Sequence, residues 1–183
     1  MTKHAVITGG GTGIGLAIAT RLVQDGITVS ITGRNATRLK NAADYIGAMA
    51  IAMDVCDEGS VISGMAKAKD HFGAIDIVIA NAGIAEGQNI QGSTLDFWRN
   101  IMDTNLDGAY LTIREALKHM PTKSWGRVIA ISSIAGLKGL KGAHAYTASK
   151  HGVVGLIRAL SEDHAKLPVT FNALCPGLSL IHI

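Results

Sequence analysis

The chain has 183 residues, of which 48% are hydrophobic and 17% charged, a balance that supports one folded domain and excludes a disordered chain. Its basic residues are scattered, so the net charge of +3 predicts no nucleic-acid partner. No apolar run approaches the ~18 residues of a membrane span. Because Cys56 and Cys175 lie far apart with no metal-like spacing, we expect free thiols and a cytoplasmic protein.

Two kinds of segment alternate along the chain. Short β-branched runs predict strands at His4–Thr8, Thr28–Thr32, Ala48–Met53, Ile75–Ala80, Arg127–Ser132 and Val169–Leu174. Longer stretches with helical spacing predict helices at Ile14–Asp25, Ala36–Ile46, Glu58–His71, Leu95–Met120 and Ala145–Ala165. This alternation predicts one α/β domain with a doubly wound, Rossmann-type parallel sheet of about six strands.

The ends of two predicted helices have local signals. Ser93 with Asp96 resembles a capping box before the longest helix, and Pro121 follows its last apolar residue. Pro168 similarly follows the last predicted helix and precedes the sixth strand.

A glycine cluster follows the first predicted strand and leads directly into a helix. The glycines fit G-x-x-x-G-x-G through Gly9, Gly13 and Gly15. Gly9 permits a sharp turn, Gly13 lets the backbone approach a pyrophosphate, and Gly15 allows close packing on the sheet. The following helix N-terminus offers free N–H groups to phosphates. The alternative is a glycine-rich turn without a ligand.

The tip of the second predicted strand bears on the choice between NAD and NADP. An acidic residue there would hydrogen-bond the ribose hydroxyls and repel a 2′-phosphate, but the strand ends in Gly33-Arg34. Arg34 can pair with a 2′-phosphate, with Arg38 one helical turn further on, so NADP(H) is favoured over NAD(H). The alternative is a solvated turn arginine.

Tyr146 and Lys150 are four residues apart at the start of a predicted helix and therefore share one face. The same face continues through Val153 and Ile157, so Lys150 is aligned with the apolar stripe that packs on the sheet. A partly desolvated ammonium near a phenol favours the phenolate, as general acid–base catalysis by a tyrosine requires.

Two further polar residues stand at informative positions. Ser133 follows the fifth predicted strand, at the sheet edge where ligands bind in open α/β folds, and its hydroxyl can hold a carbonyl oxygen. The alternative is a turn-forming serine. Asn105 falls within the apolar stripe of the longest helix, where it can hold a water molecule or divert a backbone hydrogen bond. The alternative is a structural amide.

Other chemistries lack their residue patterns. The seven histidines show no H-E-x-x-H motif or paired spacing with carboxylates, so no metal site is predicted. The absence of G-x-S-x-G counts against an α/β-hydrolase. Lys138 and Lys141 can meet an acidic partner or a phosphate, but we interpret them as solvated loop charges.

Together these residues resemble the short-chain dehydrogenase/reductase family. The matching motifs occur in family order over residues 3 to about 177, and they are Thr8-Gly9-Gly10-Gly11-Thr12-Gly13-Ile14-Gly15, Asp54-Val55, Asn81-Ala82-Gly83, Asn105, Ser132-Ser133, Tyr146-Thr147-Ala148-Ser149-Lys150 and Pro176-Gly177. The stretches around Lys150 and before Pro176 are similar to those of 3-oxoacyl-thioester reductases and polyketide ketoreductases.

The resemblance implies hydride transfer between a nicotinamide cofactor and a small-molecule carbonyl or alcohol, in a protein that forms a homodimer or homotetramer at full length. Tyr146 would protonate the carbonyl oxygen while Ser133 holds it, and Asn105 would hold a water in the proton relay. Lys150 would bind the nicotinamide ribose. The implied cofactor-binding residues are Thr8, Gly9, Gly11, Thr12, Gly13, Ile14, Gly15, Arg34, Asp54, Val55, Asn81, Ala82, Gly83, Tyr146, Lys150, Pro176 and Gly177.

The chain departs from the family pattern in two places. Thr12 stands where many NADP-dependent relatives have a basic residue. After Gly177 the family normally continues through substrate-covering helices and a seventh strand, and residues 178–183 match none of these. We therefore expect a family domain truncated after about residue 177, with strand six at an exposed sheet edge. The alternative to an enzyme is a non-catalytic nucleotide-binding or oligomerisation module of the same fold.

Overall fold

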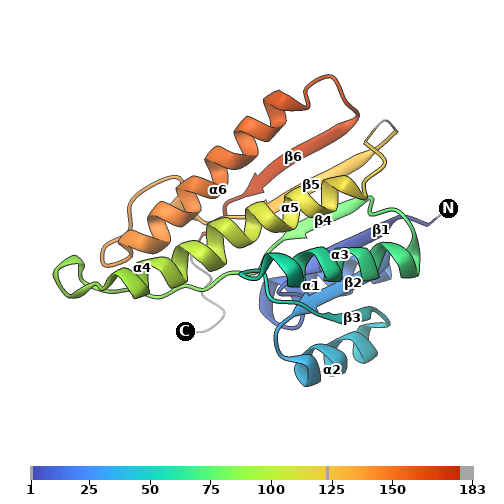
Figure 1. The fold of residues 1–183 in the computed structure, drawn as a ribbon, viewed down its shortest axis with the longest axis horizontal. Helices are drawn as coiled ribbons and strands as arrows, with labels where there is room; N and C mark the ends of the chain where they lie inside the picture. Colours follow the sequence, from blue (N-terminus) through green and yellow to red (C-terminus); the bar gives the residue numbers. More distant parts are fainter. Residues whose placement is uncertain (1, 123, 178–183) are drawn as a thin grey trace.

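The computed structural model describes residues 2–122 and 124–177. Six parallel strands form one sheet in the order β3-β2-β1-β4-β5-β6 (Figure 1). The strands are β1 His4–Thr8, β2 Thr28–Gly33, β3 Met49–Ala52, β4 Ile77–Ala80, β5 Gly126–Ile131 and β6 Val169–Leu174. The predicted doubly wound Rossmann-type fold is confirmed. Because chain order reverses between β1 and β4, a crevice opens at their carboxyl ends.

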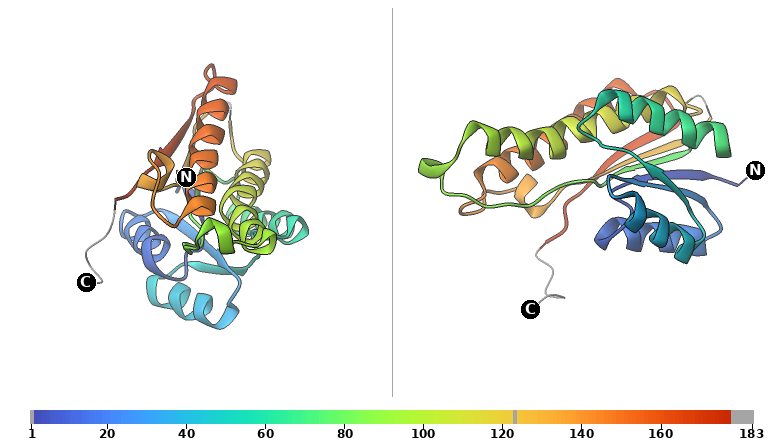
Figure 2. Two further views of the ribbon diagram at one scale, coloured as in Figure 1. Left: turned by 90° about the vertical axis from the view of Figure 1, so that its left-hand side faces the viewer. Right: turned by 60° about the horizontal axis from the view of Figure 1, so that its bottom comes forward.

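Helices cover both faces of the sheet. They are α1 Gly13–Gln24, α2 Ala36–Ile46, α3 Glu58–Phe72, α4 Leu95–Met102, α5 Gly108–Lys118 and α6 His144–Asp163. In Figure 2 the blue α1 and α2 lie on one side of the sheet, and the green to orange α3, α5 and α6 lie on the other. The strand β1 shows the consequence, because Val6 packs into one core cluster while Ala5 and Ile7 pack into the other.

The strand β6 lies at one end of the sheet and, within the described residues, pairs with β5 alone. Val169 and Phe171 are buried against the α6 side, whereas Thr170 and Asn172 are exposed on the opposite face. Leu174, on that same face, is 50% exposed. Among the described residues, β6 is therefore a sheet-edge strand with one face exposed.

The single helix predicted over Leu95–Met120 is wrong. The structure has α4, then a π-helical segment over Asp103–Asp107, then α5, which ends at Lys118. The wider π turn admits one extra residue, and it does so where the Asn105 side chain bonds to Ile84 outside the helix. A local sequence pattern does not contain that distant partner.

The predicted capping box is also displaced by one residue. Thr94, and not Ser93, caps α4, because the Thr94 hydroxyl accepts a hydrogen bond from the Phe97 N–H at 3.1 Å. The Ser93 hydroxyl instead bonds Nε2 of His144 at 3.1 Å. Ser93 therefore makes a tertiary contact and does not cap α4.

Candidate active site

The glycine turn is held by side chains that follow β4. The Thr8 hydroxyl accepts hydrogen bonds from the backbone N–H groups of Asn81 and Ala82 at 3.0 and 3.1 Å. In return, Asn81 Nδ2 donates to the carbonyl oxygens of Thr8 and Gly9 at 2.9 and 3.3 Å. The ends of β1 and β4 are thereby fixed to each other, which sets the floor of the crevice.

Two different constraints require glycine in the turn. Gly9 and Gly13 have φ values of +64° and +54°, a region that side-chain-bearing residues rarely adopt. Gly15 is required by space, since a Cβ there would lie 2.5 Å from Asn81 Nδ2 and closer still to the Gly9 carbonyl oxygen. The predicted reason for Gly15, packing on the sheet, is thus replaced by close contact with the turn itself.

The rest of the turn lines two hollows of the surface. Gly11 and Thr12 border a pocket that also contains Arg34 and Arg38, which we call the Arg34 pocket. Thr12 and Ile14 border a second pocket, which reaches Tyr146 and Lys150 and which we call the Lys150 pocket. Ile14 is 52% exposed, and its backbone N–H belongs to the first turn of α1. Backbone groups of the glycine turn therefore border both pockets, where they can bind phosphate oxygens.

A third hollow, the Asp54 pocket, adjoins the Arg34 pocket. Asp54, Val55, Ala82 and Gly83 line it, and Arg34 borders it as well as its own pocket. The Asp54 carboxylate accepts a hydrogen bond from the Cys56 N–H at 3.0 Å. Val55 is buried, and a Cβ at Gly108 would lie 2.8 Å from its side chain. The residues after β3, the glycine turn and Arg34 therefore line adjoining pockets.

Lys150 is buried at the inner wall of its pocket. It is 5% exposed, and its Nζ donates a hydrogen bond to the Ile131 carbonyl oxygen at 2.9 Å. Burial lowers the pKa of Lys150 to about 8, because desolvation penalises the ammonium form. The Nζ lies 5.7 Å from the centre of the Tyr146 ring. A positive charge is thus placed beside the phenol.

Asn105 is buried in the π-helical segment, with 1% of its surface exposed. Its Oδ1 accepts from the Ile84 N–H at 2.8 Å, and its Nδ2 donates to the Ile84 carbonyl at 2.9 Å and to Ser149 Oγ at 3.1 Å. The amide therefore ties the loop after β4 to α6. A Cβ at Gly83 would lie 3.1 Å from Asn105 Oδ1 and 3.4 Å from Lys150 Nζ, so these groups meet at one point.

The two serines after β5 have different surroundings. Ser132 is buried, and its hydroxyl donates to the Lys150 carbonyl oxygen at 3.0 Å. The Ser133 hydroxyl accepts from the Ala135 N–H at 3.1 Å and lines a fourth hollow, the Ser133 pocket. Ser133 is thus both a turn-capping residue and a pocket residue.

The Ser133 pocket is mostly apolar and touches the Lys150 pocket through two shared residues. Ala85 and Tyr146 line both. The lining residues of the Ser133 pocket are Ala85, Glu86, Gly87, Ser133, Ile134, Leu140, Ala143, Tyr146 and Gly177. Pro176, next to Gly177, accepts a hydrogen bond from the Ile134 N–H at 2.8 Å and so fixes the end of the described chain to this site.

Several residues of the site were not among the sequence candidates. Ile84 and Ala85 line the Lys150 pocket, and Cys56 and Thr104 line the Asp54 pocket. Cys56 lies three residues after the predicted strand Ala48–Met53, and Ile84 and Ala85 lie four and five residues after Ile75–Ala80. Extending each predicted strand end by five residues would therefore have identified all but Thr104. Thr104 had no such signal, because its place depends on the π turn.

Residues 2–122 and 124–177 contain no group of three or more His, Cys, Asp or Glu side chains arranged to hold a metal ion. Within the same ranges, no helix combines the length and the apolar character needed to cross a membrane. Lys138 and Lys141 are exposed in the loop after Ser133.

Comparisons with known proteins agree with this geometry. A family model described as short chain dehydrogenase matches residues 3–180. D-beta-hydroxybutyrate dehydrogenase of Rhizobium meliloti is 35% identical over 98% of this chain and 72% of that protein. The 3-oxoacyl-[acyl-carrier-protein] reductase FabG of Salmonella typhimurium is 34% identical over 96% of this chain and 72% of that protein.

A solved structure matches as well. A crystal structure of an actinorhodin polyketide ketoreductase variant with NADPH has a TM-score of 0.93 and 31% identity, covering 98% of this chain and 71% of that one. The family-model match over residues 3–180 spans the glycine turn, Tyr146 and Lys150 together. The chain belongs to the short chain dehydrogenase family of nicotinamide-dependent oxidoreductases.

Proposed function

We propose that this protein transfers a hydride between NADP(H) and a carbonyl or secondary alcohol, with Tyr146, Lys150, Ser133 and Asn105 at the reacting end of the site. The observation that carries the proposal is that Tyr146 lines both the Lys150 pocket and the Ser133 pocket. A group bound in the first pocket and a substrate bound in the second would meet at the phenol.

The residues present fit a nicotinamide dinucleotide. Gly9 and Gly13 combine positive φ with the absence of a side chain, and a Cβ built at Gly13 would meet nothing within 4 Å, so the backbone there is open to a ligand. The first turn of α1 offers unbonded N–H groups to phosphate oxygens. Asp54 and Val55 would hold the adenosine end and Lys150 the nicotinamide ribose, and the bound cofactor would supply or accept the hydride.

The side chains then divide the proton chemistry. When the carbonyl carbon gains a hydride, its oxygen takes the hydroxyl proton of Tyr146. The Lys150 ammonium, 5.7 Å from the ring centre, stabilises the phenolate left behind. The Ser133 hydroxyl donates a hydrogen bond to the same substrate oxygen. Asn105 holds the loop after β4 against α6. A water held at the π turn would then return a proton to the Tyr146 phenolate.

The preference for NADP(H) rests on charge. Arg34 and Arg38 border the Arg34 pocket, and none of the described residues that line it carries a carboxylate. A guanidinium can bind a 2′-phosphate in bidentate fashion, whereas NAD(H) offers it only neutral ribose hydroxyls.

For the substrate we propose a 3-oxoacyl thioester. The mostly apolar lining of the Ser133 pocket suits an acyl chain, and its one charged side chain, Glu86, disfavours a carboxylate beside it. Two of the matched relatives are named as reductases of 3-oxoacyl or polyketide substrates.

Calorimetry with NADPH and NADH on the 183-residue chain tests the cofactor assignment. We expect NADPH to bind more tightly, and failure of either dinucleotide to bind at millimolar concentration would contradict the proposal. Tyr146→Phe should abolish NADPH-dependent reduction of an acetoacetyl thioester while the Kd for NADPH stays within about twofold of the wild type. Near-normal turnover by this variant would remove Tyr146 from its role.

A matched control comes from Tyr110→Phe, because Tyr110 is exposed on α5 and lines none of these pockets. Its turnover should equal that of the wild type. NADPH binding without turnover of any carbonyl by the wild type would instead favour the non-catalytic alternative.

A further inference from the structure

We infer that His144 is a positioning residue. It holds the outer wall of the Ser133 pocket, formed by residues 85–87, against the loop that leads into Tyr146. The kinetic part of this inference rests on the proposed function, and the structural part does not. His144 lies two residues before Tyr146, at the first position of α6.

Two of the chain segments that line the Ser133 pocket are distant in sequence. One, Ala85–Gly87, follows β4, and the other, Leu140–Ala143, precedes α6. They meet where the Gln88 N–H donates to the Gly142 carbonyl oxygen at 2.8 Å. The fit is close, since a Cβ at Gly87 would lie 3.0 Å from that same oxygen. The width of the pocket therefore depends on how these segments are held together.

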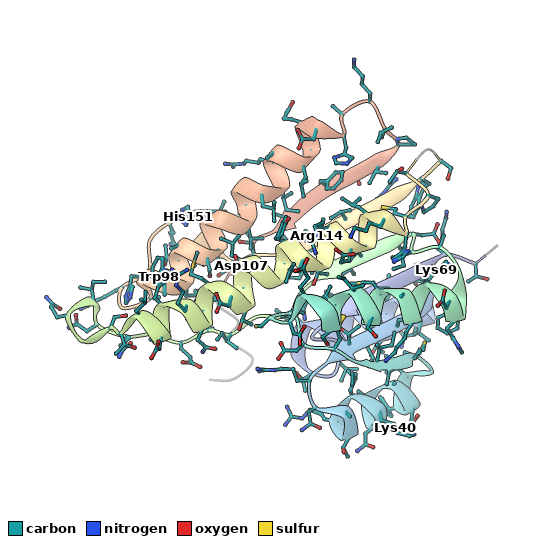
Figure 3. The ribbon with its side chains drawn as sticks, viewed as in Figure 1. Lys40, Lys69, Trp98, Asp107, Arg114 and His151 are labelled. Carbon is teal, nitrogen blue, oxygen red and sulfur yellow. The ribbon has the colours of Figure 1, made fainter. Side chains whose placement is uncertain are left out.

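His144 supplies a second attachment between the same two parts of the chain. Its Nε2 hydrogen-bonds Ser93 Oγ at 3.1 Å. Its ring stacks on that of Trp98, with centroids 6.3 Å apart and planes at 11°, and lies 6.0 Å from the Phe97 ring. Trp98, labelled in Figure 3, belongs to α4. One side chain at the start of α6 thus fixes the start of α4.

In the segment between β4 and α4, Asn81 and Ile84 are held by Thr8 and Asn105, but none of residues 85–94 is buried. The segment's only regular element is a short 3-10 helix, Ile90–Gly92, which contains no buried residue, and Ile90 itself is 64% exposed. Segments with few buried contacts open locally at low free-energy cost. The contacts of His144 therefore add to the Gln88–Gly142 bond in keeping this wall in place.

Hydrogen exchange, followed by NMR, tests the structural part. In His144→Ala the amide of Gln88 should exchange about five- to tenfold faster, as the loss of one hydrogen bond predicts. His144→Gln, whose amide can reach Ser93, should recover most of the protection. His151→Ala is the control, because His151, labelled on the same helix in Figure 3, is exposed and its ring bonds the Thr147 carbonyl within that helix.

The double variant Ser93→Ala/His144→Ala sharpens the test. If the two residues act through their mutual bond, the exchange of Gln88 in the double variant should match that of His144→Ala alone. Unchanged Gln88 exchange in His144→Ala, or fully additive effects of the two substitutions, would overturn the inference.

Kinetics separates positioning from mere support of the fold. With the N-acetylcysteamine thioester of acetoacetate as probe, His144→Ala should raise KM about tenfold, leave kcat within about twofold and leave the Kd for NADPH unchanged. His144→Gln should restore KM. Faster exchange with an unchanged KM would contradict the positioning role. Wild-type binding of NADPH without turnover would count against the proposed function alone, and the exchange data would then decide this inference.

Discussion

Lys150 Nζ donates a hydrogen bond to the carbonyl oxygen of Ile131 at 2.9 Å, which joins α6 to the carboxyl end of β5. The bond places a cation in a buried site, and burial lowers the pKa of Lys150 to about 8 from its ordinary 10.5. The helix that carries Tyr146 is therefore anchored to the sheet by the group that would assist the phenol chemically.

The lowered pKa of Lys150 predicts a pH-dependent stability. Between pH 8 and 10.5 the unfolded chain holds the Lys150 proton and the folded chain has lost it, so the free energy of unfolding rises with pH over this window. The contribution of Lys150 should be about 3 kcal/mol across the window. Urea unfolding at closely spaced pH values measures it.

The Lys150→Met variant isolates this contribution from other titrations. Its stability curve should lack the rise, whereas Lys141→Met, at an exposed loop position, should keep it. Parallel curves for wild type and Lys150→Met between pH 8 and 10.5 would contradict the shifted pKa.

Asn105→Ala should destabilise the fold by about 2–4 kcal/mol, because the partly buried backbone groups of Ile84 lose their partners. Asn100→Ala, at an exposed position of α4, should change stability by less than about 0.5 kcal/mol. Chemical denaturation measures both. Equal effects of the two substitutions would show that the Asn105 amide contributes nothing beyond its helix position.

Gly15→Ala should cost about 2–3 kcal/mol and weaken NADPH binding, since the new Cβ would collide with Asn81 and the Gly9 carbonyl. Gly155→Ala makes the same chemical change within α6, where a Cβ meets nothing within 4 Å. It should raise stability by about 0.5–1 kcal/mol through helix propensity. Thermal unfolding measures the stability of both variants, and calorimetry measures their NADPH binding. If Gly15→Ala changed neither stability nor binding, the close contact of Gly15 with Asn81 and Gly9 would be contradicted.

Arg34→Ala should raise the Kd for NADPH about tenfold or more while the Kd for NADH stays within about twofold, because only NADPH has a 2′-phosphate to bind. Arg21→Ala provides the control, since Arg21 pairs with Asp25 on α1 and lines none of the pockets of the site. A parallel loss of both dinucleotides in Arg34→Ala would mean that Arg34 does not select between them.

The sequence predicted the elements well where the signal is local. The alternation of apolar runs located all six strands, although β3 and β4 are shorter than predicted, at Met49–Ala52 and Ile77–Ala80. It failed at Asp103–Asp107, because the π turn there accompanies bonds between Asn105 and residues 21 and 44 positions away. It also misplaced the cap of α4, since Ser93 bonds to His144, 51 residues distant.

The sequence by itself determined the parallel α/β architecture, the position of the glycine turn and the shared face of Tyr146 and Lys150, because each follows from spacing within one segment. Only the tertiary structure decided which groups meet in the site. The contact of Gly15 with Asn81, the bond from Lys150 to Ile131 and the separate roles of Ser132 and Ser133 all join different strands and helices. Their partners are set by sheet order and packing, which no local pattern encodes.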